Sequence, residues 1–198
     1  HNDARRQRQM CIRDRIVGIT SDPDDEDGIA VYGDAEADFQ MSFQNSMRWK
    51  DLELSFVLHW KQGGDAINLT SLLSDIFQTS FDYDGTDLDP DGVLSNGDYR
   101  LSQLGVSAEP WVQDASYVRL RELGLFYNIP RAKLKNVFKN SVQSIRVGVS
   151  GYNLLSFFSY NSYDPEVSNF VGRGVSSGVE VSPFPSSKRF YFHFDIGF

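Results

Sequence analysis

Apolar and polar side chains alternate along several segments of this chain. Over residues 39–49 and again over residues 52–61, apolar residues stand at nearly every second position, which is the period of a β-strand with two different faces. Only Lys50 and Asp51 separate the two runs, so they predict a hairpin whose strands are long enough to cross a bilayer. In the second run the apolar members are Leu52, Leu54, Phe56, Leu58 and Trp60, and the residues between them are Glu53, Ser55, Val57, His59 and Lys61.

Three further strands are predicted downstream. Residues 116–128 also alternate, but the parity of their apolar positions shifts between Leu120 and Leu123, which predicts a β-bulge. Pro130 begins a short helical connection through Phe138, and the alternation returns over residues 144–153. The last run, residues 188–198, places one aliphatic and four aromatic side chains on one face: Phe190, Phe192, Phe194, Ile196 and Phe198.

Two of the connections between these strands are long. Residues 62–114 are rich in Gly, Asp, Ser and Asn, and only the patch 69–77 predicts a helix, while glycines and prolines interrupt residues 157–187. Such loops count against a compact soluble domain, whereas outer-membrane barrels carry long extracellular loops and short periplasmic turns. Long and short connections fall on opposite ends, as up-and-down strands require. The predicted fold class is all-β, with about five antiparallel strands of a large transmembrane β-barrel.

This fold also assigns side chains to lipid or to the barrel interior. We expect lipid-facing side chains at Leu54, Phe56, Leu58, Phe192 and Phe194, and interior ones at Glu53, His59, His193 and Asp195. The two histidines are interpreted as polar lining residues, because their spacing fits no metal motif. Since no nucleophile, base and orienting group are recognisable either, the chain is predicted not to be an enzyme.

Composition narrows the function further. A formal net charge of −8 and a pI near 4.8 argue against a nucleic-acid partner, because neutralising phosphates requires clustered Lys and Arg. The one cysteine, Cys11, excludes a disulfide within the chain. Residues 1–15 are basic and the residues after them are acidic. We therefore predict a non-native or disordered lead at 1–15, with a native basic arm as the alternative, and a barrel region at 16–198.

One acidic stretch has the spacing of a calcium loop. Its oxygen ligands would fall at positions 1, 3, 5, 7 and 12, with Gly92 at position 6, as in an EF-hand. The residues concerned are Asp87, Asp89, Asp91, Val93 and Asp98. Position 12 is Asp in place of the longer Glu, Pro90 stands at position 4, and flanking helices are not evident. Calcium is the single cofactor that the sequence suggests, and a solvated acidic loop is the alternative.

Several segments resemble the end of SusC/RagA-family TonB-dependent importers. The order and spacing of the segments also match that family, over nearly everything from about Gly28 onward. They are GDAEADF (33–39), DLELSFVLHWKQGGD (51–65), ASYVRLRELGLFYNIP (115–130), VGVSGYNLLSF (147–157), YDPEVSNF (163–170) and PFPSSKRFYFHFDIGF (183–198). The terminal run from Phe190 to Phe198 also resembles the signal that the barrel-assembly machinery reads.

The resemblance implies a plugged outer-membrane barrel of about 22 strands, of which residues 16–198 would be the C-terminal part. Members of the family take up oligosaccharides or peptides across the outer membrane of Bacteroidota-like bacteria. A SusD-like surface lipoprotein caps the barrel, and TonB supplies energy through N-terminal parts that this chain lacks. The implied partners are thus a SusD-like lipoprotein, TonB, the barrel-assembly machinery, outer-membrane lipid and a glycan or peptide substrate.

Two questions stay open in the sequence. A soluble β-sandwich that binds carbohydrate would also show short alternating strands, although its turns should recur every 8 to 12 residues or so. The residues that would choose between glycan and peptide cargo are not identifiable from this part of a barrel.

Overall fold

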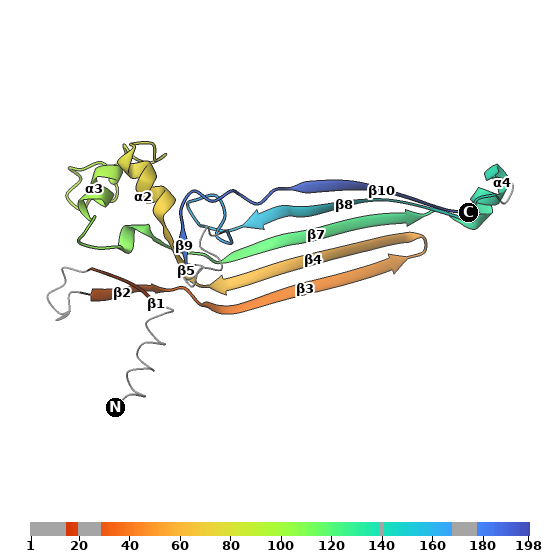
Figure 1. Cartoon of the computed structure of the whole chain (residues 1–198), viewed down its shortest axis with the longest axis horizontal. Helices are drawn as coiled ribbons and strands as arrows, with labels where there is room; N and C mark the ends of the chain where they lie inside the picture. Colours follow the sequence, from red (N-terminus) through yellow and green to blue (C-terminus); the bar gives the residue numbers. More distant parts are fainter. Residues whose placement is uncertain (1–14, 20–28, 139–140, 168–177) are drawn as a thin grey trace, which may run out of the picture. The chain divides into compact units, whose positions relative to one another are not determined.

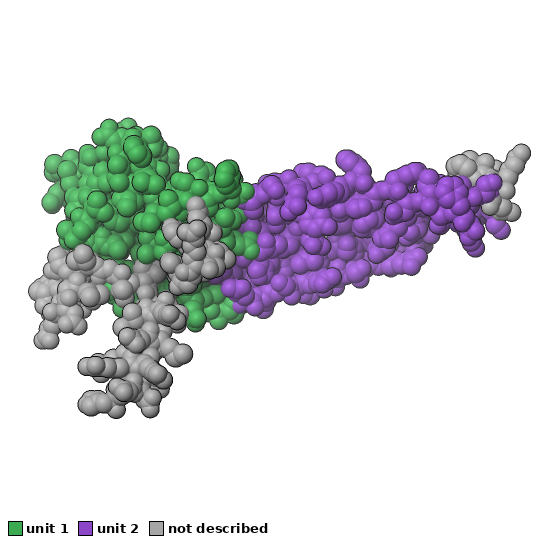
Figure 2. Space-filling model, viewed as in Figure 1, with its two compact units in different colours: residues 1–39, 62–116, 158–185 green, residues 40–61, 117–157, 186–198 purple. Residues whose placement is uncertain are grey.

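The structure, a computed structural model, describes residues 15–19, 29–138, 141–167 and 178–198. It separates into two compact units, and each is described by itself (Figure 2). The sheet unit comprises residues 40–61, 117–157 and 186–198, and the loop unit comprises residues 1–39, 62–116 and 158–185. Apart from Arg15, the predicted lead at 1–15 lies outside the described residues.

An antiparallel five-stranded sheet forms the sheet unit (Figure 1). Its strands are β3 (Ala37–Trp49), β4 (Leu52–Gly63), β7 (Tyr117–Asn128), β8 (Ser144–Phe157) and β10 (Arg189–Gly197). The spatial order β10-β8-β7-β4-β3 follows the chain, so each of these strands pairs with the next one along the sequence. The five predicted strands and their up-and-down arrangement are confirmed.

The connections and the irregularity of this sheet also follow the sequence. Lys50 adopts a positive φ of 55° in the short turn between β3 and β4. The register of β7 shifts against both neighbours between Leu120 and Glu122. Against β4, Arg121 is the extra residue of the predicted β-bulge, and on β8 Asn153 and Leu154 are left unpaired at the same level. Between β7 and β8 the chain forms α4 (Arg131–Phe138), the helical connection expected after Pro130.

The pairing register defines two faces of the sheet. Phe56 lies opposite Leu123, Leu123 opposite Gly151, and Gly151 opposite Phe190, so one row crosses four strands on the same side. The ring of Phe43 lies 5.9 Å from that of Phe56, which brings β3 onto this side too. We call it the apolar face: it carries no charge and includes Met41, Phe43, Leu52, Leu54, Phe56, Leu58, Trp60, Leu123, Leu125, Tyr127, Val147, Val149, Phe190, Phe192, Phe194 and Ile196.

The opposite side is the polar face. It carries the four residues predicted to face the barrel interior, Glu53, His59, His193 and Asp195. Arg146 lies opposite Asp195, and Phe126 lies opposite Glu53. The predicted division of side chains between two faces is therefore present in the register.

The loop unit contains more regular structure than predicted. β1 (Arg15–Ile19) pairs with β2 (Ile29–Asp34), and a second small sheet joins β5 (Asp65–Asn68) to β6 (Val112–Asp114) and, in parallel, to β9 (Val179–Glu180). The helix predicted over 69–77 is present as α2 (Leu69–Ile76). The remainder of 62–114 was expected to be loop, and that expectation was wrong at α3 (Asn96–Ser102), the 3₁₀ turn η1 (Glu109–Trp111), β5 and β6.

Polar residues make up much of the interior of the loop unit. Among its described residues, Asn68, Asp75, Asn96, Arg100, Asp164 and Glu180 are all buried, together with the apolar side chains of Ala66, Trp111, Ala115, Tyr160, Pro165 and Pro183. Such a unit depends on satisfying its buried polar groups with one another. Within the described residues, no helix has the length and apolar character needed to span a membrane.

Candidate functional site

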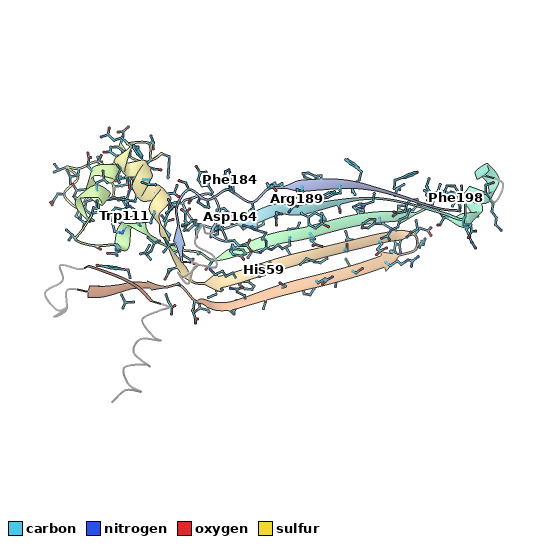
Figure 3. All side chains as sticks on the ribbon, viewed as in Figure 1. His59, Trp111, Asp164, Phe184, Arg189 and Phe198 are labelled. Carbon is cyan, nitrogen blue, oxygen red and sulfur yellow. The ribbon has the colours of Figure 1, made fainter. Side chains whose placement is uncertain are left out.

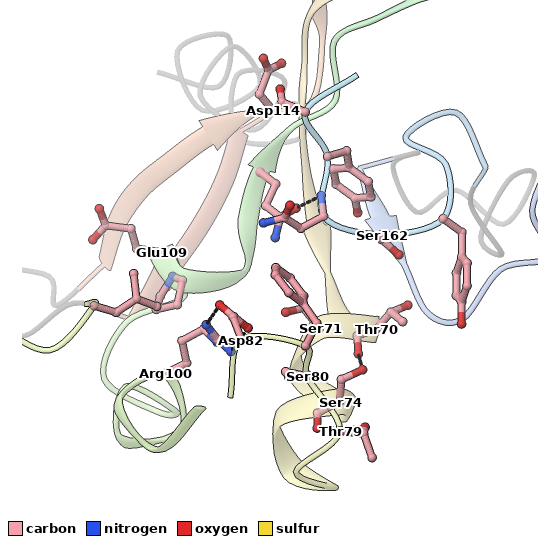
Figure 4. Close-up of a pocket in the computed structure, with 18 of the residues that line it drawn as sticks. Thr70, Ser71, Ser74, Thr79, Ser80, Asp82, Arg100, Glu109, Asp114 and Ser162 are labelled. Carbon is pink, nitrogen blue, oxygen red and sulfur yellow. Dashed lines mark hydrogen bonds and ion pairs between the residues drawn. The ribbon is translucent and has the colours of Figure 1, made fainter. Parts of the chain in front are cut away.

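The loop unit contains a cavity of about 1030 Å³ that is partly open to solvent (Figure 4). Its walls come from α2, the segment 79–82, α3, the strip from Glu109 to Asp114, and residues 159–163. Hydroxyl groups are frequent on these walls, supplied by Thr70, Ser71, Ser74, Thr79, Ser80, Tyr99, Ser159, Tyr160, Ser162 and Tyr163. A cavity of this size and polarity suits a small polar ligand or part of an oligomer.

A buried arginine organises one wall of the cavity. Arg100 donates from Nε and Nη2 to the two carboxylate oxygens of Asp75, at 2.8 and 2.7 Å, and from Nη1 and Nη2 to those of Asp82, at 2.9 and 3.0 Å. Asp75 is fully buried and also accepts a hydrogen bond from the hydroxyl of Ser80. Asp75, and secondarily Asp82, raise the pKa of Arg100 above its usual value. The guanidinium therefore ties α2, α3 and the segment between them together.

These bonds also limit how many N–H groups Arg100 has left to bind a ligand. A guanidinium has five N–H groups, and the two carboxylates already use most of them. With two carboxylates around one cation, the local charge is not positive. Arg100 is therefore a structural element of the cavity wall and not an anion-binding group.

A second buried polar residue joins the two long connections to each other. The side-chain oxygen of Asn68 caps α2 by accepting the N–H of Ser71 at 2.8 Å. Its Nδ2 donates to Oε1 of Gln113 at 3.4 Å and to the carbonyl of Asn161 at 3.2 Å. Oε1 of Gln113 in turn accepts the N–H of Asn161 at 2.9 Å. Residues far apart in sequence are thus fixed side by side around the cavity.

Tyr160 is the buried aromatic residue of the cavity wall. Burial raises the pKa of its hydroxyl, and the carboxylate of Glu180 raises it further. The phenol therefore keeps its proton at neutral pH. Glu180 also accepts a hydrogen bond from the hydroxyl of Thr70 at 3.0 Å, which links β9 to the start of α2.

The predicted calcium residues are spread over a turn and the start of α3. Oδ2 of Asp89 accepts the backbone N–H groups of Val93 and Leu94 at 2.8 and 2.7 Å, and these bonds lower the pKa of Asp89. Oδ1 of Asp87 accepts Nδ2 of Asn96 at 2.8 Å, which lowers the pKa of Asp87.

Asp98 belongs to the first turn of α3. It accepts the hydroxyl of Tyr83 at 2.7 Å and that of Ser95 at 2.9 Å, and both bonds lower the pKa of Asp98. Ser95 reciprocates by capping the N–H of Asp98 at 3.2 Å. Among the described residues no three His, Cys, Asp or Glu side chains gather as metal ligands. The calcium loop stays a prediction.

A stacked polar network runs across the polar face of the sheet unit. Arg146 forms an ion pair with Glu53 at 3.0 Å, and its guanidinium lies 4.2 Å from the ring centre of Phe126. The ring of Phe126 lies 5.2 Å from that of His193, and Nε2 of His193 lies 2.7 Å from the hydroxyl of Ser150. The network crosses β4, β7, β8 and β10, so it adds side-chain contacts to the backbone pairing.

A second cluster surrounds His59 on the same face. Nδ1 of His59 lies 3.3 Å from the hydroxyl of Tyr117 and 3.1 Å from Nη2 of Arg121, the bulge residue. The guanidinium of Arg119 lies 5.2 Å from the ring centre of Tyr117. Neither cluster combines a nucleophile with a base and an orienting group, so the polar face is a lined surface.

On the apolar face the terminal aromatic run is exposed. Phe192 has 87% of its surface exposed, and Phe190, Phe194, Ile196 and Phe198 are exposed as well. Phe198 follows β10 at the end of the sheet where α4 also lies (Figure 3). Four of the five predicted assembly residues thus lie on the edge strand β10, and Phe198 directly follows it.

The chain was compared with known protein families and with individual proteins. No family model matches the chain. Among curated proteins it is similar to TonB-dependent receptor P3 of Formosa agariphila, with 28% identity over 165 residues that cover 81% of this chain. It is also similar to TonB-dependent receptor P26 of the same organism, with 26% identity over 183 residues that cover 87% of this chain. The chain is thus similar to TonB-dependent receptors over most of its length. It spans 16% and 18% of the lengths of these two relatives.

Solved structures agree with this assignment. The RagAB peptide importer in its open-open state matches with a TM-score of 0.61 and 17% identity, covering 91% of this chain and 20% of the other. The RagAB peptide transporter matches with a TM-score of 0.60 and 20% identity, covering 84% and 18%. The fold of this chain is therefore all-β and matches part of a TonB-dependent receptor barrel, as predicted, and not a β-sandwich. These relatives are named as receptors and importers, which are not enzymes, and this agrees with the prediction made from the sequence.

The buried Arg100 group was not predicted from the sequence, although one signal for it was available. Between Lys61 and Arg119 the chain holds ten acidic residues and one basic residue, Arg100. A lone cation in such a stretch is the natural centre for the carboxylates around it. Asp75 gave a second signal, since it lies inside the amphipathic patch that forms α2.

Proposed function

We propose that this chain is part of an outer-membrane importer that draws energy through TonB and takes up oligopeptides or glycans with a SusD-like lipoprotein. The observation that carries the proposal is the division of the sheet into a charge-free apolar face and a polar face. Residues 16–198 then form part of the barrel wall, with the polar face toward the interior. The RagAB neighbours, which are importers of peptide, support this class of function.

The height of the apolar face supports placement in a bilayer. Aromatic residues stand near both of its ends, Trp49 and Tyr127 at the turn end and Trp60 and Phe157 at the loop end. From Leu52 to Trp60 the strand advances eight residues, roughly 26 Å at about 3.3 Å per residue. A strand tilt of about 40° reduces this to roughly 20 Å, close to the apolar band of about 25 Å that such barrels present to lipid.

The loop unit offers surfaces for the cargo and for the lipoprotein. Its cavity is lined with hydroxyls and aromatic rings, as a polar oligomer requires. Several large apolar side chains of the same unit are exposed, among them Phe77, Phe81 and Val93. Exposed apolar groups on a polar unit are typical of a protein-binding surface.

Uptake in the native bacterium tests the importer. We expect labelled oligopeptide or oligosaccharide to enter cells that carry the full-length receptor and to be excluded when either TonB or the proposed SusD-like lipoprotein is deleted. Uptake that continues without TonB would contradict the proposal. Running both cargo classes side by side decides between peptide and glycan.

A pair of variants tests the cavity separately. Tyr163 lines the cavity and is half-exposed, so Tyr163→Ala should weaken binding of the cargo that the uptake assay identifies. Phe184→Ala is the matched control, because Phe184 is an exposed aromatic residue of the same unit that does not line the cavity. Equal binding by both variants and the parent would remove the cavity from the cargo path.

The exposed aromatic run also supports recognition by the barrel-assembly machinery. Four of its five residues alternate along the edge strand β10, Phe198 follows directly, and all five side chains are exposed among the described residues. Phe198→Ala in the full-length receptor should reduce its level in the outer membrane while leaving synthesis unchanged. Phe184→Ala serves as control here too, and equal outer-membrane levels for the two variants would argue against the signal.

A further inference from the structure

Basic residues collect at the turn end of the sheet unit. They come from the β3–β4 turn and from α4, two connections that are neighbours because the N–H of Asn128 donates to the carbonyl of Asp51 at 2.8 Å. The turn segment 48–51 and the helix 131–138 contain a single carboxylate, Asp51. We call the five cations the basic collar: Arg48, Lys50, Arg131, Lys133 and Lys135.

The collar is exposed and its charges are not neutralised within the described part of the chain. All five side chains are exposed, and none forms an ion pair with a described residue. Nε of Arg131 donates to the carbonyl of Gln143 at 3.3 Å, and Nε of Arg48 lies 3.4 Å from the carbonyl of Lys50. These contacts with neutral carbonyls position the cations without cancelling their charge.

This concentration runs against the charge of the rest of the chain. The whole chain carries a formal net charge of −8, and residues 62–116 hold ten acidic residues against the single Arg100. A random scatter of surface lysines would not leave one end of the sheet basic in so acidic a chain. The collar therefore points to an anionic partner at that end.

The position of the basic collar along the strands indicates the depth at which it would lie in a bilayer, and this depth points to the partner. Trp49 is 71% exposed at the edge of the apolar face, and the ammonium of Lys50 lies 5.1 Å from the centre of its ring. Exposed Trp and Tyr residues lie at the boundary between hydrocarbon and headgroups in membrane proteins. The residues that follow, first Lys50 and then α4 beyond β7, are therefore at the depth of the lipid phosphates.

We propose that the basic collar binds the phosphates of anionic phospholipids in the leaflet that surrounds the turn end of the barrel. The cations are distributed over two connections, so they match a layer of phosphates better than a single small anion. Long flexible side chains suit this task, because each can reach outward to a headgroup while its stem stays against apolar surface. The inference rests on the bilayer placement proposed above.

Lipid retention by the full-length receptor tests the collar. The receptor is reconstituted into nanodiscs of phosphatidylcholine and phosphatidylglycerol in equal amounts, extracted gently, and the phospholipid that stays bound is measured by mass spectrometry. We expect phosphatidylglycerol to be enriched several-fold in the parent receptor. Lys133→Gln/Lys135→Gln should lower the enrichment, and adding Lys50→Gln should lower it further.

The control is Lys188→Gln, an exposed lysine just before β10 at the opposite end of the sheet, which should leave the enrichment unchanged. Enrichment that persists in the triple variant would overturn the proposal. Loss of enrichment on adding inorganic phosphate at constant ionic strength would also overturn it, in favour of a site for free anions. A receptor that imports its cargo but retains both lipids equally refutes only the collar, whereas a chain that does not enter nanodiscs refutes the barrel placement itself.

Discussion

The two units of this chain place charged and apolar residues in opposite ways. The loop unit buries Asp75, Arg100 and Asn68 and exposes large apolar side chains such as Phe81. The sheet unit keeps its charges on one face and exposes an entire apolar face on the other. The loop unit is thus held together by its own polar bonds in water, whereas the sheet unit is complete only with hydrocarbon on one side.

The largest expected effect concerns the polar interior of the loop unit. Arg100→Ala leaves Asp75 fully buried without its cation, which should cost about 3–5 kcal/mol of local stability. Hydrogen exchange over residues 69–103 of the full-length receptor measures this as faster opening. The double variant Arg100→Met/Asp75→Leu removes both charges and should open less than the single variant. If Arg100→Ala leaves exchange unchanged, the polar bonds do not hold the unit.

The assignment of the two faces is tested by introducing one arginine, either on the apolar face or on the polar face. Phe190 lies in the central row of the face and is 69% exposed, so Phe190→Arg removes little packing within the chain. In a bilayer it should nevertheless destabilise the barrel by about 2–4 kcal/mol, and Phe56→Arg in the same row should cost at least as much. Unfolding in lipid vesicles provides the measurement. Tyr191→Arg, on the polar face, is the matched control, and an equal cost for it would contradict the assignment of faces.

A smaller effect is expected at the stacked network of the polar face. A Cβ atom on Gly148 would lie 2.3 Å from Cδ1 of Phe126, whose ring supports the guanidinium of Arg146. Gly148→Ala should therefore displace the ring and cost about 1–3 kcal/mol. The same unfolding assay measures the cost. Gly92→Ala is not a suitable control, because Gly92 has a positive φ of 64° that strains any other residue. Unchanged stability would mean that Phe126 moves freely and that the stack is not needed.

Most of the sheet unit could be predicted from the sequence, because side-chain alternation reports directly on two different surroundings. The parity shift between Leu120 and Leu123 even located the bulge at Arg121. The loop unit could be predicted only in part. α3 is a seven-residue helix, NGDYRLS, whose sequence has no apolar stripe, and it is held by Arg100 and by Ser95 as its cap. Bonds between residues far apart in sequence leave no local pattern.

The acidic turn gives a prediction about pH. Hydrogen bonds from Leu94 and Val93 lower the pKa of Asp89, so the ionised carboxylate is favoured in the folded turn. Its contribution to stability is present above the ordinary pKa of an Asp and is lost as the pH falls through the lowered value. Exchange of the Val93 and Leu94 amides should therefore accelerate in acid, and Asp89→Asn should accelerate it at neutral pH. Equal protection in parent and variant at neutral pH would contradict this role of Asp89.

The smallest effect expected is that of calcium on this same turn. Binding would require Asp87, Asp89 and Asp98 to share their oxygens with donors that they already bond, which are Asn96, two backbone amides, and the hydroxyls of Tyr83 and Ser95. That competition and the short Asp at position 12 predict weak affinity, roughly 10⁻⁴–10⁻³ M as in extracellular sites. Calorimetric titration of the full-length receptor should release heat that Asp87→Ala/Asp91→Ala abolishes. Indistinguishable titrations would leave the turn as a hydrogen-bonded acidic loop, stabilised like the rest of its unit by protein donors alone.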